Sequence, residues 1–146
     1  MITNRRGSGS VYLTLSLVLL FASCAPQFVA PYDPATDSAV TNVQQQLGTL
    51  FAEQQRTDPP VCDYDNYVGF YDALDVDLGS LVIRNEAREQ NQLTVRQLRL
   101  LGDSLDNLEA LHQRSGCLPE GQIEVLQRQF DTSFTAILRL ELAKRR

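Results

Sequence analysis

Apolar residues recur at spacings of three and four in four separate segments of this chain, and no other feature constrains its fold as strongly. Such spacing places the side chains on one face of an α-helix. The four stripes are Val40, Val43, Leu47 and Leu50; Tyr67, Tyr71, Leu74, Leu78 and Leu81; Leu98, Leu101, Leu105, Leu108 and Leu111; and Ile123, Leu126, Phe130, Phe134 and Ile137. No segment shows the sustained alternation of a β-strand, so the sequence predicts an all-α fold.

Start and stop signals flank the first two stripes. Asp33 followed by Pro34 is typical of a helix start, because a carboxylate caps free backbone N–H groups and proline suits the first helical position. Pro59-Pro60 is expected to end this segment. The second helix is expected to begin near Asp63, with the polar run Arg84–Gln92 as its exposed end.

The third helix is expected to start at a capping box. Thr94 and Gln97 have the spacing at which each side chain bonds the backbone N–H of the other residue. Leu93 and Leu98 can pack across this box as a hydrophobic staple. Gly116 supplies the C-terminal stop.

The fourth helix is expected to begin with Pro119 at its first position and Glu120 in its first turn, where a negative charge is favourable. Short connections between four helices favour an antiparallel arrangement. We therefore predict an antiparallel four-helix up-and-down bundle, as one domain over residues 33–146, with one disulfide.

A different signal lies near the N-terminus, where Arg5 and Arg6 precede an apolar run from Val11 to Ser23. This layout is typical of a secretory signal. The run is 13 residues long, whereas a helix needs roughly 20 apolar residues to span a bilayer. A retained transmembrane anchor is therefore not expected.

The end of that run, Phe21-Ala22-Ser23-Cys24, resembles the lipobox of bacterial lipoproteins. Ala22, Ser23 and Cys24 fit the pattern, whereas Phe21 stands where Leu is usual. The resemblance implies that residues 1–23 are removed as a signal peptide. It also implies that Cys24 becomes the first mature residue and carries lipid. Cells supplied with labelled palmitate would then incorporate the label at Cys24.

The lipobox resemblance also implies a location. Residues 24–32 would form a tether to the membrane. Ala25, which is not Asp, resembles the outer-membrane destination of enterobacterial lipoproteins, so a periplasmic protein anchored to the outer membrane is favoured over the inner membrane. The alternative is ordinary cleavage after Ala25, because Ser23 and Ala25 form a small-x-small pair. That alternative gives a soluble periplasmic protein of unknown activity.

The two remaining cysteines, Cys62 and Cys117, form an even pair once Cys24 carries lipid. An oxidising periplasm would join them in a disulfide; the alternative is two buried free thiols. The predicted topology places the start of the second helix and the turn before the fourth at the same end, so the pair can meet. The same topology places the lipid and Lys144-Arg145-Arg146 at the opposite end.

Charge limits the partners that we expect. The full chain has a net charge of −5, and removal of Arg5 and Arg6 with the signal makes it −7. Nucleic-acid binding needs clustered positive charge, so no nucleic-acid partner is expected.

For the basic C-terminal segment Lys144-Arg145-Arg146 we weigh contact with anionic headgroups against a frayed soluble tail.

The segment from Asp63 to Asp72 is rich in acidic and aromatic residues. It begins like a calcium loop, but Tyr67 stands where a third oxygen ligand belongs, Gly69 falls one place late, and Leu74 replaces the bidentate Glu. We interpret the segment as a helix N-terminus with favourable Asp charges and a Tyr stripe in the core. The alternative is a partner surface, since Tyr is enriched at interfaces.

The remaining candidates for catalysis are few. Asp75 and Asp77 are two residues apart and do not face the same way on a helix, so a solvated face is expected. His112 is the single histidine and has no Cys or His partner for a metal, so a surface position or a contact with a helix C-terminus is expected. We expect no enzyme, no cofactor and no metal.

The mature chain as a whole resembles small, uncharacterised helical lipoproteins and exported helical proteins of proteobacteria. The stretches that carry the resemblance are Tyr32–Asp37, Leu93–Leu101, Leu108–His112 and Ala136–Lys144. It implies a lipid-anchored periplasmic bundle that acts as a structural or interaction module of the envelope, with the membrane and an envelope protein as partners. The alternative is a bundle that holds an apolar small molecule between helices, lined by Tyr and Phe.

Overall fold

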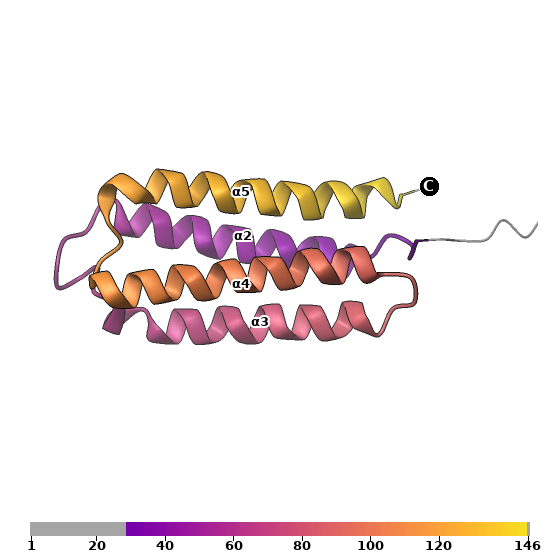
Figure 1. Ribbon diagram of the computed structural model, residues 1–146, viewed down its shortest axis with the longest axis horizontal. Coiled ribbons are helices and arrows are strands. Elements are labelled where there is room, and N and C mark those ends of the chain that lie inside the picture. The colour runs from indigo at the N-terminus through magenta and orange to yellow at the C-terminus, as the bar shows by residue number, and fades with distance from the viewer. Residues whose placement is uncertain (1–28, 146) are drawn as a thin grey trace, which may run out of the picture.

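The computed structural model describes residues 29–145, which form four long helices and one short 3₁₀ helix, with no strand among them. The elements are α2 (Pro34–Gln54), η1 (Tyr64–Asn66), α3 (Val68–Glu86), α4 (Gln92–Ser115) and α5 (Glu120–Ala143). Figure 1 shows the four long helices side by side along one axis, each antiparallel to the next along the chain. The predicted four-helix bundle is confirmed.

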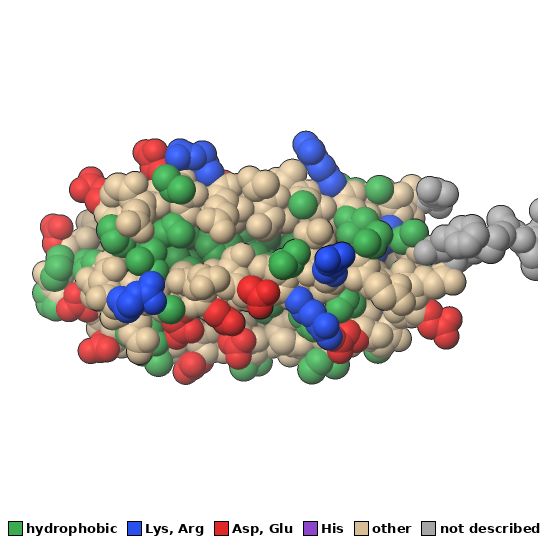
Figure 2. Space-filling view, in the orientation of Figure 1, with side chains coloured by type: hydrophobic (Ala, Val, Ile, Leu, Met, Phe, Trp, Pro, Cys, Tyr) green, Lys and Arg blue, Asp and Glu red, His purple; other side chains and the backbone are tan. Residues whose placement is uncertain are grey.

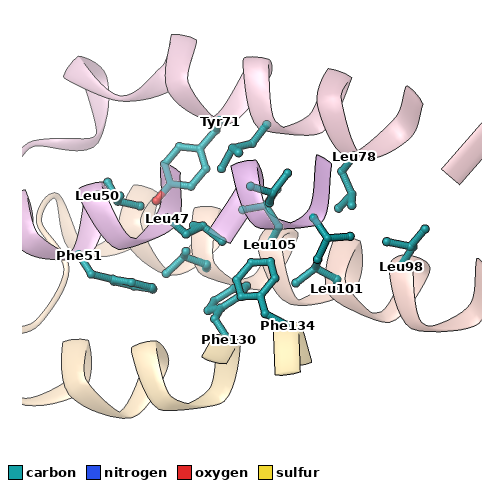
Figure 3. Close-up of a cluster of buried hydrophobic side chains, with 14 of the residues drawn as sticks. Leu47, Leu50, Phe51, Tyr71, Leu78, Leu98, Leu101, Leu105, Phe130 and Phe134 are labelled. Atoms are coloured by element: carbon teal, nitrogen blue, oxygen red, sulfur yellow. The ribbon is translucent and has the colours of Figure 1, made fainter. Parts of the chain in front are cut away.

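Each helix packs against two neighbours, so that α2 contacts α3 and α5, and α4 contacts the same two helices. The core lies between all four and is made of the predicted apolar stripes, with Tyr67, Leu111 and Leu126 only partly buried. Figure 3 shows side chains from all four helices meeting there, among them Phe51 of α2, Tyr71 of α3, Leu101 of α4 and Phe134 of α5.

The bundle has two chemically different ends. The start of α2, the α3–α4 connection and the end of α5 lie together, and we call this the terminal end (Figure 1, right). The α2–α3 connection with η1 and the α4–α5 connection lie at the other end (Figure 1, left), which we call the disulfide end. Every position discussed below is assigned to one of them.

The helix signals predicted at Asp33, Pro34 and Gly116 act as expected, whereas the one at Pro119 is displaced. Asp33 caps α2, its Oδ1 accepting from the Ala35 N–H at 3.2 Å, with Pro34 in the first turn. Gly116 ends α4 with φ +77°, a backbone conformation that favours glycine. Pro119 lies one place earlier than predicted, as the N-cap of α5 rather than its first residue.

Two predicted helix starts are wrong. The helix expected to begin near Asp63 begins at Val68, because the Tyr64 N–H donates to the Gly116 carbonyl at 2.7 Å and holds this stretch as η1. The capping box at Thr94 is also absent, since α4 starts at Gln92 and Thr94 is fully buried against α5.

The polar segment between α3 and α4 is only partly exposed, which corrects a third expectation. Asn85 and Asn91 are buried, with 0% and 2% of their surface exposed, although Glu86, Glu89 and Gln90 are exposed. Among the helices of residues 29–145, none is long and apolar enough to cross a bilayer. Cys24 and the whole predicted signal lie outside the described residues.

Candidate functional site

The apolar stripe of each helix continues into a polar residue at the terminal end. Thr36 of α2, Asn85 of α3, Thr94 of α4 and Glu141 of α5 are all completely buried. We call these four residues the terminal polar layer. Buried polar groups are costly unless they are hydrogen-bonded, so this layer fixes how the four helices are placed at that end.

One side of the layer joins α2 to α3. The Thr36 hydroxyl donates to Asp33 Oδ2 at 2.8 Å and accepts from Asn85 Nδ2 at 3.0 Å. Arg84 also donates to Asp33 through Nε, at 3.1 Å. The Arg84 hydrogen bond holds the pKa of the Asp33 carboxyl at about 2, well below its usual value, with further contributions from Thr36 and the Ala35 N–H.

The other side joins α4 to α5. The Lys144 ammonium is buried and donates to Asn91 Oδ1 at 2.8 Å, to Thr94 Oγ1 at 2.7 Å and to Glu141 Oε1. Thr94 donates to the same Glu141 oxygen at 2.6 Å. Lys144 is therefore neither a frayed tail nor free to contact headgroups, which corrects both expectations for this residue.

Arg145 is held as well. Its guanidinium lies 4.2 Å from the ring centre of Tyr32 and its Nη2 lies 3.5 Å from Asp37 Oδ2. The hydrogen bond to the Tyr32 hydroxyl raises the pKa of Arg145 further above its ordinary value. Arg146 lies outside the described residues.

His112 lies at the disulfide end and is completely buried, so the predicted surface position is wrong. Its Nε2 lies 2.8 Å from the Cys62 carbonyl oxygen, which can only accept, so Nε2 carries the hydrogen. Its Nδ1 then accepts from the Tyr71 hydroxyl at 3.0 Å. Burial lowers the pKa of His112 and raises the pKa of Tyr71, because both groups resist becoming charged there.

Aromatic rings surround this histidine. The ring centres of Tyr64, Tyr67 and Tyr71 lie 5.7, 5.3 and 5.8 Å from the imidazole centre. The Tyr64 hydroxyl donates to Glu109 Oε1 at 2.8 Å, which raises the pKa of Tyr64. The predicted Tyr stripe in the core is confirmed, but α3 has no acidic residue in its first turn, so the predicted favourable Asp charges are absent.

Cys62 and Cys117 form a disulfide with their Cα atoms 5.1 Å apart, as predicted. The Cys62 carbonyl accepts from His112 and from Gln54 Nε2, the latter at 3.0 Å. Asp63 stands close enough to both sulfurs to suggest a metal site. Thiolate is the form of cysteine that ligates metals, so the intact disulfide leaves no such ligand set here.

Asp75 and Asp77 are both exposed, as predicted for a solvated face, and Asp77 accepts from Gln46 at 3.2 Å. The geometry therefore brings together two groups of polar residues, the terminal polar layer and the His112 cluster. Most of their hydrogen bonds tie helices to one another, although Glu141 Oε2 is buried without a hydrogen-bond partner among residues 29–145.

Charge is divided unequally along the bundle. The half nearest the terminal end (residues 29–44, 78–103 and 132–145) holds seven Lys and Arg against six Asp and Glu. The half nearest the disulfide end (residues 45–77 and 104–131) holds three Arg against twelve Asp and Glu, a net charge of −9. Figure 2 shows carboxylates gathered over the disulfide end, at the left of the view.

Hollows on the described surface do not enter the middle of the core. One hollow is lined in part by Val95 and Leu100 of α4, and another by Ala39 and Val43 of α2. The core phenylalanines pack against one another instead. The ring centre of Phe130 lies 5.9 Å from that of Phe51 and 6.4 Å from that of Phe134.

Searches of family models, of curated proteins and of solved structures find no match to this chain. The functional argument therefore starts from the arrangement of residues just described.

Proposed function

We propose that this protein is a lipid-anchored module of the bacterial envelope, held to the membrane through Cys24, whose acidic disulfide end binds a positively charged partner protein. The observation that carries the proposal is the net charge of −9 on the half of the bundle farthest from the start of α2. A surface of one sign attracts and orients partners of the opposite sign.

Two features of that end support a binding role. The disulfide and the His112 cluster hold the α2–α3 and α4–α5 connections together, so the acidic surface is rigid before it meets a partner. Rigidity reduces the entropy lost on binding. Val61 and Val68 are exposed beside the acidic residues, at 58% and 38%, and supply apolar contact area.

The disulfide also supports an exported protein, because such bonds persist in oxidising compartments. It does not distinguish lipid anchoring from ordinary cleavage near Ala25. Metabolic labelling with palmitate makes that distinction. We expect label in the parent chain and none after Cys24→Ser; an unlabelled parent would leave the soluble periplasmic alternative.

The second candidate function, binding of an apolar small molecule between the helices, is less well supported. Such a ligand needs a cavity that is largely enclosed and apolar. The aromatic side chains proposed to line it, including Phe130 and Phe134, pack against each other and against Phe51.

Site-directed photo-crosslinking in living cells tests the partner. A photoreactive residue at Val61, at the disulfide end, is compared with one at Ile83, which is similarly exposed at 67% but lies in the other half. We expect adducts at Val61 only, and we expect them to weaken when Asp63 and Asp65 are changed to Asn. Equal adducts at both positions, or adducts insensitive to these changes, would contradict an acidic docking end.

A further inference from the structure

A hollow of about 510 Å³ lies at the terminal end, between the last turn of α3 and the first turns of α4. The buried residues Asn85 and Asn91 form part of its wall. Their side-chain amides are already committed to the terminal polar layer, because Asn91 donates to Asn85 at 2.7 Å and Asn85 donates to Thr36. This part of the wall is thus built from groups that are already paired.

Three arginines and one glutamate supply the charge of this hollow. Arg88, Arg96 and Arg99 line it together with Glu86, giving a local surplus of two positive charges on a chain whose net charge is −5. Arg99 pairs with Glu86. Arg96 is exposed and has neither an ion pair nor a hydrogen bond to any residue from 29 to 145.

Arg88 is the most informative of the three. Its Nη2 donates to the Pro31 carbonyl, but its Nη1 is buried and has no hydrogen-bond acceptor in the described part of the chain. Nη1 forms an ion pair with Asp33, whose Oδ2 lies 3.6 Å away. Arg88 also lines the hollow, so its guanidinium holds a positive charge beside any anion bound there.

The start of α4 adds to the positive electrostatic potential of the three arginines. Asn91 occupies the N-cap position but makes no side-chain capping bond, and the first turn of α4 carries no acidic residue. Gln92, in that turn, lines the hollow. The free N–H groups of a helix start favour a negative ligand, and they act here alongside the arginines.

The geometry points to a binding site for a phosphate group in this hollow, contacted by Arg88, Arg96 and Arg99. Guanidinium groups match the oxygens of phosphate through paired hydrogen bonds. The source of the phosphate is an anionic lipid headgroup, because the hollow lies at the end where α2 begins and the N-terminal segment joins the bundle. The choice of a lipid source rests on the proposed anchoring through Cys24, whereas the phosphate site does not.

The test uses residues 24–146 with Cys24→Ser, so that neither the apolar signal segment nor a covalent lipid holds the protein to a vesicle. Inorganic phosphate is titrated while backbone amide signals of residues 91–96 are followed by NMR. The variant Arg96→Gln/Arg99→Gln is compared with Arg128→Gln/Arg139→Gln, which removes the same charge from a hollow of similar size, about 490 Å³, on α5. Circular dichroism confirms that each variant folds.

We expect saturable phosphate binding that weakens about tenfold or more in the first variant and changes less than about twofold in the second, since charge-assisted hydrogen bonds are lost only there. Equal weakening in both variants, or no saturable binding by the parent, would overturn the site.

A second measurement identifies the source. Flotation with vesicles of phosphatidylcholine containing a third phosphatidylglycerol should retain the parent and the α5 variant, but not Arg96→Gln/Arg99→Gln. Phosphate binding without retention on vesicles would overturn the lipid source and leave free phosphate as the ligand. Palmitate labelling reports on the anchor separately, so its failure can be told apart from failure of this site.

Discussion

His112 donates its Nε2 hydrogen to the carbonyl oxygen of Cys62 at 2.8 Å, and this bond ties α4 to the residue that carries one half of the disulfide. Nδ1 accepts from Tyr71 on the other side of the ring. The Tyr71 bond requires the neutral imidazole, because a protonated ring has no acceptor for the Tyr71 hydroxyl, whereas Nε2 can donate to Cys62 in either form. The disulfide end is therefore held together in part by a histidine whose pKa burial lowers below its ordinary value.

Stability is expected to fall on mild acidification. Burial lowers the pKa of His112 in the folded state below the unfolded value of about 6.5. As the pH falls, His112 therefore binds a proton in the unfolded chain before it does so in the folded one. The contribution of neutral His112 to the free energy of unfolding is fully present above about pH 6.5. Below that pH the free energy of unfolding decreases by up to about 1.4 kcal/mol per pH unit. Urea denaturation at about pH 7.5 and 5.5 measures this change. His112→Gln, which lacks the only imidazole, should show a smaller dependence; an equal dependence would contradict the assignment.

Removal of the Tyr71 hydroxyl tests the same bond from the other side. Tyr71→Phe leaves Nδ1 of the buried His112 without a donor, and we expect a loss of about 1–3 kcal/mol in the free energy of unfolding. Tyr67→Phe is the matched control, since its hydroxyl lies 3.5 Å from the exposed Glu53 and makes no hydrogen bond to His112. That control should change stability by less than about 0.5 kcal/mol. Similar losses in both would argue that ring packing, not the hydrogen bond, matters.

The positions of these polar groups were present in the sequence as continuations of the apolar stripes. His112 follows Leu108 by four residues, and Glu141 follows Ile137 by four. Thr36 and Thr94 each precede the first apolar residue of a stripe by four. The periodicity that predicted the helices therefore also marked these residues as buried, although their polarity suggested exposure.

The partners of these residues could not be predicted in the same way. Periodicity defines the inward face of each helix, but it does not set the register between helices. Thr94 shows the consequence, because its local capping signal was outweighed by the Glu141 carboxylate of α5 and the ammonium of Lys144, which follows that helix. The hollow lined by Arg88, Arg96 and Arg99 was not predicted for a related reason. Arg88 and Arg99 line the same hollow only once α3 and α4 pack side by side as antiparallel helices.

Loss of the disulfide is expected to reduce stability strongly. The bond joins residues 55 positions apart, and removal of such a cross-link typically costs about 2–5 kcal/mol. Cys62→Ala/Cys117→Ala should therefore unfold at a lower urea concentration than the parent. This prediction assumes that Cys62 and Cys117 are joined in the cell. Thiol titration of the denatured, unreduced Cys24→Ser protein tests that assumption. Two reactive thiols in that protein would show that the pair is not oxidised in the cell.

The buried ion pair between Lys144 and Glu141 is expected to be sensitive to the loss of one partner. Lys144→Met leaves the Glu141 carboxylate buried without its cation, and we expect a loss of about 3–5 kcal/mol. Lys144→Met/Glu141→Leu removes both charges and should recover most of that loss. The exposed pair of Arg128 and Glu124 is the control, for which Arg128→Ala should cost less than about 1 kcal/mol. A double variant no more stable than the single one would contradict this account.

Asp33 is expected to lose its contribution only in strong acid. Its pKa is held at about 2 by Arg84, below the ordinary value of 3.8, so the charged form is favoured by folding. Asp33→Asn keeps a good helix cap but removes the charge, and at neutral pH it should be less stable than the parent by about 1 kcal/mol, allowing for solvent screening.

That difference should persist at pH values above 3.8, shrink as the pH falls from 3.8, and disappear below about 2, because Asp33 is then uncharged in the folded parent as well. Urea denaturation of the two chains at matched pH measures it, with other carboxylates cancelling in the comparison. Asp75→Asn, an exposed position with no hydrogen bond or ion pair to residues 29–145, should change stability by less than about 0.5 kcal/mol. A parent and Asp33→Asn that are equally stable at neutral pH would mean that Arg84 and Asp33 contribute nothing to the terminal end beyond the cap.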